Sequence, residues 1–140
     1  SCHVIKHGDF ATREAFDRKM HEQLLHHSAQ IVCLAGFMRL LSPWFVGQWQ
    51  GRLLNIHPSL LPKFKGPYAV RDALAAGEKI TGCTVHLVTP EMDSGPVILQ
   101  AEVPVIKGDT EESLAGRIHA EEHRVYPQAL KAVILRTAKP

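Results

Sequence analysis

The run IVCLAG, residues 31–36, decides the class of fold. Its first five residues are all apolar and a glycine ends it, which is typical of a short strand buried in a parallel sheet. The preceding residues predict a helix at 12–27, because Phe16, Met20 and Leu24 fall four apart and form one apolar stripe. A helix that leads into a buried strand is the repeating unit of an α/β sheet.

Further elements continue this alternation along the chain. Ser42 followed by Pro43 is a helix N-cap with proline at the first helical position, and Gly77 is a good stop for another helix. In chain order we expect a strand at 2–5, a helix at 12–27, a strand at 31–35, a helix at 43–49, a strand at 53–56, a loop at 58–67, a helix at 69–76, strands at 81–88 and 97–105, and a helix from 110 to about 135 that Pro127 interrupts.

The two long strands differ in character from the earlier ones. Val85 and Leu87 alternate with Thr84 and His86, so one face of that strand is polar and partly exposed. This pattern indicates an antiparallel addition to the parallel part. We therefore expect an α/β domain with a mostly parallel sheet and an antiparallel C-terminal addition, all within residues 1–140.

The bulk composition excludes several classes of protein. The chain is 45% hydrophobic and 21% charged, which is ordinary for a globular domain. Its formal charge of +2, with nine histidines taken as neutral, calls for neither nucleic acid nor an acidic membrane as partner. No apolar run approaches the length needed to span a membrane. A local binding site for an anion stays possible with this balance of charge.

The cysteines point to a reducing compartment. There are three, at positions 2, 33 and 83, and an odd count without close pairing argues against a disulfide framework. Cys33 and Cys83 lie in apolar segments, so we expect buried free thiols. A cytosolic location, or the interior of a comparable organelle, follows from this interpretation.

The stretch LLNIHP, residues 53–58, carries the first candidate for chemistry. Asn55 and His57 point to the same side of the predicted strand, because strand side chains alternate. A carboxamide beside an imidazole can stabilise an oxyanion that develops on a carbonyl under attack. The alternative is structural: an Asn that closes a turn beside a His that satisfies backbone groups.

The loop between the two long strands carries the second candidate, Asp93. If this loop folds back over the sheet, the carboxylate reaches His57, favours a protonated ring and accepts a proton directly or through water. The alternative is again structural, because Asp before Ser-Gly is good turn chemistry.

A third candidate, for ligand binding, follows the apolar strand at 31–35. The segment FMRLL, residues 37–41, leaves a strand end at the edge where α/β sheets bind ligands. Its apolar side chains can wall a flat aromatic ligand while backbone groups contact the polar rim. Ordinary core packing at a corner between strand and helix is the other interpretation.

Several segments together resemble the folate-dependent formyltransferases, and among them the phosphoribosylglycinamide formyltransferases. The resemblance covers essentially the whole chain. It rests, in order and spacing, on Ala35-Gly-Phe-Met-Arg-Leu-Leu-Ser42, Leu54-Asn-Ile-His-Pro-Ser-Leu-Leu-Pro62, Gly82-Cys-Thr-Val-His86, Met92-Asp-Ser-Gly-Pro-Val-Ile-Leu-Gln100 and Glu122-His123. The Asn-x-His and Asp-x-Gly combination is shared with methionyl-tRNA formyltransferases and formyltetrahydrofolate deformylases.

The resemblance implies a Rossmann-like three-layer fold and transfer of a formyl group from 10-formyltetrahydrofolate to the amine of glycinamide ribonucleotide, in purine synthesis. Folate is a cosubstrate there, and no metal is needed. The roles that it implies are catalysis by Asn55, His57 and Asp93; folate binding by Phe37, Met38, Arg39, Leu40, Leu41, Val88, Thr89, Pro90 and Glu91; and ribonucleotide binding by Pro58, His86 and Glu122.

Two departures from the family pattern bear on the second substrate. The family begins with further strands and a glycine-rich turn that binds the substrate phosphate at a helix N-terminus. Here the chain starts near the family's third strand, so we expect an N-terminally incomplete domain with an uncovered sheet edge. The family also carries a His soon after the glycine at position 66, where this sequence has Pro67, Tyr68, Ala69 and Val70.

Other interpretations stay open beside this one. Hydrolysis of the same folate uses the same three residues, with water as the nucleophile. A folate-binding protein without catalysis is the alternative outside the enzymes. His119 and His123 share a helix face, but the sequence places no third ligand for a metal near them. Oligomeric state and fusion to other purine enzymes are left open.

Overall fold

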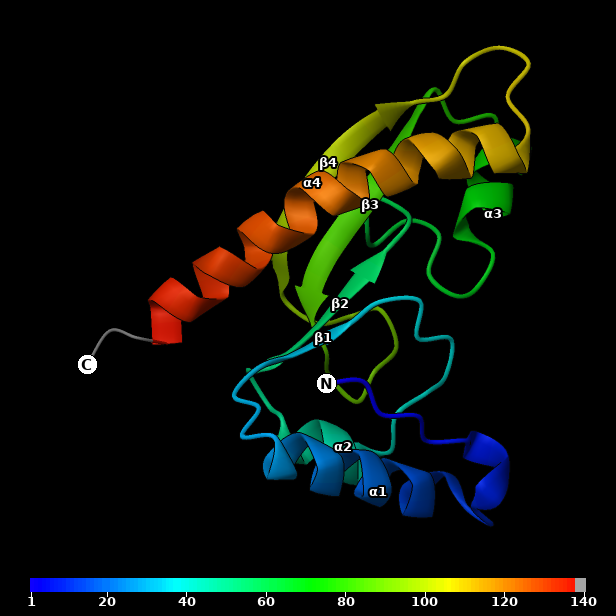
Figure 1. Ribbon diagram of the computed structural model, residues 1–140. Helices are drawn as coiled ribbons and strands as arrows, with labels where there is room; N and C mark the ends of the chain where they lie inside the picture. Colours follow the sequence, from blue (N-terminus) through cyan, green and yellow to red (C-terminus); the bar gives the residue numbers. More distant parts are fainter. Residues whose placement is uncertain (138–140) are drawn as a thin grey trace.

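The strands form one sheet in the order β1-β2-β3-β4, in a computed structural model that describes residues 1–137 (Figure 1). The strands are β1 (Val32–Leu34), β2 (Leu53–His57), β3 (Ile80–Leu87) and β4 (Val97–Pro104). β1 and β2 run parallel, whereas β3 pairs antiparallel with both β2 and β4. The α/β class and the antiparallel addition are confirmed. The expected parallel majority is not, because one pairing of the three in the described residues is parallel.

The helices lie close to their expected places. They are a short 3-10 helix, η1 (His7–Asp9), and the α-helices α1 (Arg13–His26), α2 (Pro43–Gln48), α3 (Ala69–Ala75) and α4 (Glu111–Thr137). The hydroxyl of Thr12 caps α1 by accepting from the Ala15 amide at 3.1 Å. The hydroxyl of Ser42 caps α2 by accepting from the Phe45 amide at 3.3 Å. These caps satisfy amides that have no partner inside the helix.

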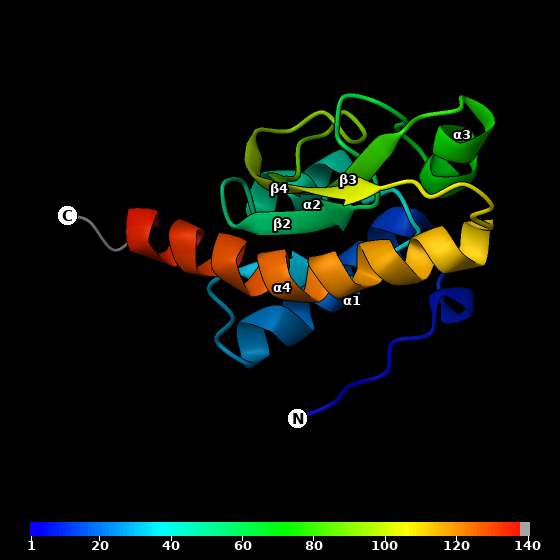
Figure 2. The same cartoon turned by 90° about the horizontal axis from the view of Figure 1, so that it is seen from above.

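Helices cover both faces of the sheet. Leu54 faces a core built with α4, whereas Leu53, one residue earlier, faces a core built with α2 and the partly buried side of α1. Successive strand residues point to opposite faces, so these two leucines belong to different layers. Figure 2 shows α4 lying alongside β2 and β4 as a layer of its own. The sheet is therefore the middle of three layers.

Helix α4 continues through Pro127, where we expected an interruption. Proline removes one hydrogen bond from a helix interior, but packing on both sides compensates here. Val125 precedes Pro127 and Ala129 and Val133 follow it, and all three are buried in the same core. A hydroxyl on this helix also fastens the sheet: Tyr126 donates to the carbonyls of Leu34 at 2.6 Å and Leu54 at 3.2 Å.

Two expectations near the start of the sheet are wrong. Residues 2–5 form no strand in the structure, although their sequence is apolar enough for one. Cys33 is exposed rather than buried, because β1 is an edge strand within the described residues and nothing pairs on its outer side. Cys83, on the central strand β3, is buried as expected. No helix within residues 1–137 has the length and apolar character that crossing a bilayer requires.

Candidate active site

Strand β2 presents Asn55 and His57 on one face, as the sequence predicts. The antiparallel register places His86 of β3 opposite Asn55 and Thr84 opposite His57. Paired residues of neighbouring strands point to the same face. Four polar side chains therefore lie together on a strand pair whose other residues are mostly apolar.

The ring of His57 is held by a backbone carbonyl. Its Nε2 lies 2.8 Å from the carbonyl oxygen of Phe64, and the side chain is almost fully buried. A carbonyl only accepts, so Nε2 carries a hydrogen and donates it. Phe64 adopts a left-handed backbone conformation, with φ of 53°, that turns its carbonyl toward the ring. Nδ1 is the ring nitrogen left to meet other groups.

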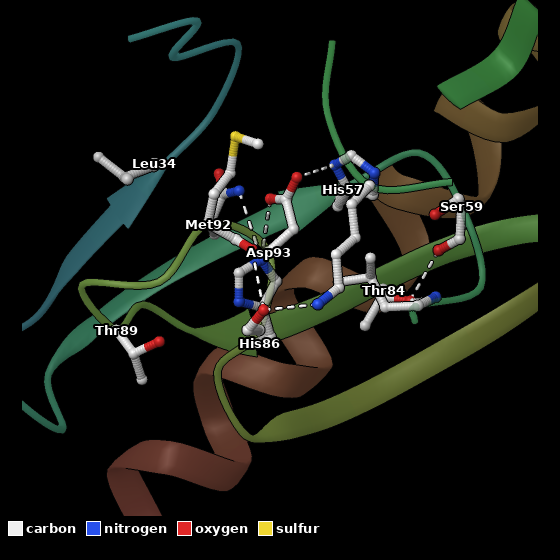
Figure 3. Close-up of polar contacts among 12 residues, drawn as sticks. Leu34, His57, Ser59, Thr84, His86, Thr89, Met92 and Asp93 are labelled. Atoms are coloured by element: carbon white, nitrogen blue, oxygen red, sulfur yellow. Dashed lines mark hydrogen bonds and ion pairs between the residues drawn. The ribbon is translucent and has the colours of Figure 1, made fainter. Parts of the chain in front are cut away.

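Asp93 faces that free nitrogen. The loop between β3 and β4 folds back over the sheet, and Oδ2 of Asp93 lies 3.6 Å from Nδ1 of His57 (Figure 3). The same oxygen accepts a hydrogen bond from the Gly66 amide at 2.9 Å. Asp93 has a φ of 49°, which Asp tolerates better than most residues. Asp93 thus stabilises the turn and also contacts His57, so both interpretations of this residue hold.

His86 belongs to the same cluster, with its two nitrogens in different environments. Nδ1 donates to the Leu87 carbonyl at 3.0 Å, so Nε2 keeps a lone pair that accepts from Nδ2 of Asn55 at 3.5 Å. Burial lowers the pKa of His86, although the Leu87 carbonyl and Asp93 act in the opposite direction. A neutral His86 therefore holds the amide group of Asn55 in one orientation.

These residues line a cavity of about 460 Å³ over the β2–β3 face. Every residue that the sequence analysis named for catalysis, folate binding or ribonucleotide binding is part of its lining. The sequence analysis missed further lining residues: Leu34, Gly36, Val46, Ile56, Gly66, Pro67, Met92 and His119. Gly36, Gly66 and Met92 adjoin named residues, and His119 is three residues before Glu122, on the same helix face. Nothing in the sequence places Val46 here.

One side of the cavity is formed by residues 36–41, which we call the wall segment. All six of its residues line the cavity. Residues 88–93 of the β3–β4 loop line another part of it. Met38 is 76% exposed, Leu40 56% and Met92 49%. Large apolar side chains left open around a cavity are a fit for a flat apolar ligand that covers them.

Glu122 enters the cavity from α4, on the far side of the sheet. Burial raises the pKa of its carboxyl group, and the nearby His119, His123 and His57 partly offset this. The Nε2 atom of His119 lies 4.0 Å from Oε2 of Glu122. The lining of the cavity thus includes an acidic group from α4 as well as the apolar wall, and a carboxyl group suits a ligand with amine or hydroxyl donors.

Metal and thiol chemistry find no support in the described part of the chain. Residues 1–137 contain no group of three or more His, Cys, Asp or Glu side chains arranged to hold a metal ion. Burial raises the pKa of Cys83 to about 11, so its thiol stays protonated and is a poor nucleophile.

The formyl transferase family matches residues 1–130, almost the whole chain. The chain belongs to the formyl transferase family. Relatives agree with this assignment. A trifunctional purine biosynthetic protein adenosine-3 from Chironomus tentans is 55% identical over 130 residues, 93% of this chain and 10% of that protein. The phosphoribosylglycinamide formyltransferase of Escherichia coli is 50% identical over 127 residues, 91% of this chain and 60% of that enzyme.

Solved structures of family members share the fold. The glycinamide ribonucleotide transformylase 1 of Symbiobacterium toebii matches with a TM-score of 0.87 at 51% identity, over 89% of this chain and 59% of that one. The phosphoribosylglycinamide formyltransferase of Streptococcus pneumoniae matches with a TM-score of 0.89 at 36% identity, over 94% of this chain and 73% of that one. The Rossmann-like formyltransferase fold is confirmed, and the chain spans only part of the length of these relatives.

The sequence departure after Gly66 has a clear position in the fold. Pro67 lines the cavity, whereas Tyr68 is 55% exposed. The guanidinium of Arg71 stacks over the Tyr68 ring, 4.1 Å from its centroid. Val70 instead packs against the main core. The side chains that stand where the family pattern has a His therefore contribute no imidazole to this side of the cavity.

Proposed function

We propose that this chain transfers a formyl group from 10-formyltetrahydrofolate to the amino group of glycinamide ribonucleotide. The observation that carries the proposal is the juxtaposition of Asn55, His57 and Asp93 over one cavity. The names of its relatives support the reaction: the Escherichia coli protein is a phosphoribosylglycinamide formyltransferase, and the Chironomus tentans protein is trifunctional in purine biosynthesis.

Asn55 and His57 act on the oxyanion. When the amine attacks the formyl carbon, the C=O bond becomes a single bond and its oxygen becomes negative. The amide group of Asn55, oriented by His86, has a second N–H available for this oxygen. His57 has only Nδ1 available, because Nε2 donates to the Phe64 carbonyl. Nδ1 can donate to the oxyanion only in the imidazolium form of the ring, whose positive charge would face the Asp93 carboxylate. In that form, two fixed donors in a buried site stabilise the charge without reorganisation.

Asp93 transfers a proton between the two substrates. The attacking amine must lose a proton, and the folate nitrogen that leaves must gain one. Oδ2 of Asp93 faces Nδ1 of His57 and is anchored by the Gly66 amide, whereas Oδ1 has no recorded hydrogen bond in the described residues and lies 3.9 Å from Nε2 of His86. A carboxylate so placed accepts the proton from the amine, directly or through one water, and returns it toward the leaving nitrogen.

The two substrates occupy different parts of the cavity. The pterin ring of the folate lies against the wall segment and the loop residues Val88, Thr89, Pro90 and Glu91, where apolar side chains are open. The ribonucleotide lies near Pro58 and Glu122. We assign His86 to the orientation of Asn55 rather than to direct ribonucleotide binding, because it is only 2% exposed. Three free cysteines support a cytosolic location.

Hydrolysis of the folate is the rival within the same site, with water in place of the amine. The test is turnover of 10-formyltetrahydrofolate by the 140-residue chain with and without glycinamide ribonucleotide. Transfer predicts a tetrahydrofolate signal that needs the ribonucleotide and gives a formylated amine. Formate release at the same rate without the amine would instead establish a hydrolase.

A further inference from the structure

The hydrogen bonds that hold the wall segment lie beside its two ends, and its last residue, Leu41, also packs against the core around α2. Within residues 1–137, no hydrogen bond is recorded for any of the residues 36–41, and they belong to no helix or strand. At one end, the Leu34 carbonyl accepts from the Tyr126 hydroxyl at 2.6 Å. At the other end, the Ser42 amide donates to Oδ2 of Asp17 at 2.6 Å. The residues that flank the segment are therefore hydrogen-bonded to Tyr126 of α4 at one end and to Asp17 of α1 at the other.

Asp17 is an unusual anchor. It lies within α1 and is only 1% exposed, although a buried carboxylate is costly unless it is well paired. No ion pair of the described residues involves it, and its one recorded hydrogen bond is the one from Ser42. That bond is short and charge-assisted, hence stronger than a bond between neutral groups. A neutral apolar residue would fill this helix position at lower cost.

Asp17 lies behind the wall rather than in the cavity. A second hollow, of about 310 Å³, is lined by Arg39 and Leu40 of the wall segment and by His7, Arg13, Phe16 and Asp17. Arg39 and Leu40 also line the main cavity, whereas Asp17 does not. The wall is therefore one residue layer thick at this point, with the cavity on one side and Asp17 on the other.

We infer that Asp17 is a positioning residue, which fixes the wall segment through Ser42 and thereby sets the affinity of the cavity for the folate without touching it. The inference rests on the proposed function for the identity of the ligand. The mechanical part of it, the link between Asp17 and the wall, is independent of any ligand. A wall without internal hydrogen bonds moves when an end anchor is lost, and a displaced wall loses contact with a flat ring.

The first test is hydrogen exchange of backbone amides in the ligand-free chain. Asp17→Ala leaves the Ser42 amide without its acceptor, so exchange should accelerate by about tenfold at Ser42. The amides of residues 37–41 have no recorded acceptor within the described chain to lose, so the mobility of the wall is followed by the rate of trypsin cleavage after the exposed Arg39, which should also rise by about tenfold. Exchange in β3 and β4 should stay unchanged. The control is Glu22→Ala, which removes an exposed carboxylate of the same helix whose recorded partner in the described residues is Lys19. Unchanged cleavage after Arg39 in Asp17→Ala would overturn the inference.

The second test is binding and turnover of 10-formyltetrahydrofolate. For Asp17→Ala we expect a Kd for the folate about tenfold higher, a KM raised to match and a kcat within twofold of the wild type. Asp17→Asn keeps an acceptor oxygen and should restore most of the affinity. A folate Kd in Asp17→Ala equal to that of the wild type would overturn the inference. So would a fall in kcat with KM unchanged.

A pair of variants at Ser42 covers the case in which Asp17→Ala does not fold. Ser42 has φ of −66°, which proline adopts, so Ser42→Pro removes the amide donor without straining φ. Its Cδ takes the place of the amide hydrogen and also pushes Oδ2 of Asp17 away from residue 42. Ser42→Ala keeps the amide and removes only the cap on α2. Faster trypsin cleavage after Arg39 and weaker folate binding in the proline variant, relative to the alanine variant, support the inference. Equal values overturn it. Wild-type chain that binds no folate would refute the proposed function, while the cleavage rates would still decide the mechanical link.

Discussion

The Nε2 atom of His57 lies 2.8 Å from the Phe64 carbonyl, and this contact determines what the rest of the ring can do. With Nε2 committed as a donor, Nδ1 is the ring atom that faces Asp93, at 3.6 Å from its Oδ2. The distance is too long for a hydrogen bond and short enough for charge to matter. Nδ1 can donate to a substrate oxygen only when both ring nitrogens carry a hydrogen. The three-residue site thus depends on a backbone carbonyl seven residues along the chain.

Replacing Asp93 by Asn tests the proton transfer. Asn keeps an oxygen for the Gly66 amide and tolerates the positive φ, but it cannot accept a proton. We expect kcat for formyl transfer to fall by about 10²–10⁴ and the thermal midpoint to stay nearly unchanged. Steady-state kinetics together with thermal unfolding measure both. A kcat within threefold of the wild type would remove Asp93 from the chemistry.

His86→Gln tests the buried neutral histidine through the pH dependence of stability. Burial lowers the pKa of His86 in the folded state, so below its ordinary value of 6.5 the unfolded chain binds a proton that the folded chain does not. The wild type should therefore lose free energy of unfolding as the pH falls from 8 to about 5.5. The variant should lose less, with the slopes differing by at most about 1.4 kcal/mol per pH unit, the value for one proton. Urea titrations across this range give both slopes; parallel slopes would mean that His86 titrates normally.

Gly95→Ala tests the close contact beneath the Asp93 loop. Gly95 is buried, and a Cβ there would collide with the carbonyl group of Leu87, which also accepts from His86. We expect a loss of about 2 kcal/mol or more in the free energy of unfolding, and weaker formyl transfer. Gly116→Ala is the control: its site in α4 is open, so the substitution should be neutral or stabilise by about 0.5–1 kcal/mol. Equal stability changes in the two variants would contradict the structure here.

Tyr126→Phe tests the bridge between α4 and the parallel strands. It removes the hydroxyl that donates to the carbonyls of Leu34 and Leu54, and leaves both without that donor. Denaturant unfolding should show a loss of about 1–3 kcal/mol. Tyr68→Phe, at an exposed ring with no recorded hydrogen bond, should change stability by less than about 0.5 kcal/mol. Similar values for the two substitutions would show that the bridge contributes nothing.

The sequence predicts most elements here because each has a local signal. The helix 13–26 follows from one apolar stripe, α2 from Ser42 and Pro43, and β1 from an apolar run that ends at Gly36. The failures depend on distant parts of the chain. Cys33 is exposed because of its place at the edge of the sheet, which its apolar neighbours do not reveal. Helix α4 continues through a proline because of the core that holds both of its halves.

The site shows the same division. Alternation along β2 predicts that Asn55 and His57 share a face, and the structure agrees. The position of His86 opposite Asn55 depends on the register between two strands, which no local pattern encodes. The hydrogen bond from His57 to Phe64 involves a backbone carbonyl, to which the identity of the side chain gives no clue. For Asp93 the sequence left two interpretations, contact with His57 or a purely structural role in the turn, and only the position of the folded loop decides between them.

The most direct measurement is formyl transfer from 10-formyltetrahydrofolate to glycinamide ribonucleotide by the 140-residue chain, beside His57→Ala. We predict transfer that requires the ribonucleotide and a kcat lower by about 10²–10³ in the variant, the cost of losing one oxyanion donor. Circular dichroism would confirm that the variant is folded. Absence of transfer by the wild type, or equal rates in the two proteins, would contradict the assignment of this cavity as a formyl-transfer site.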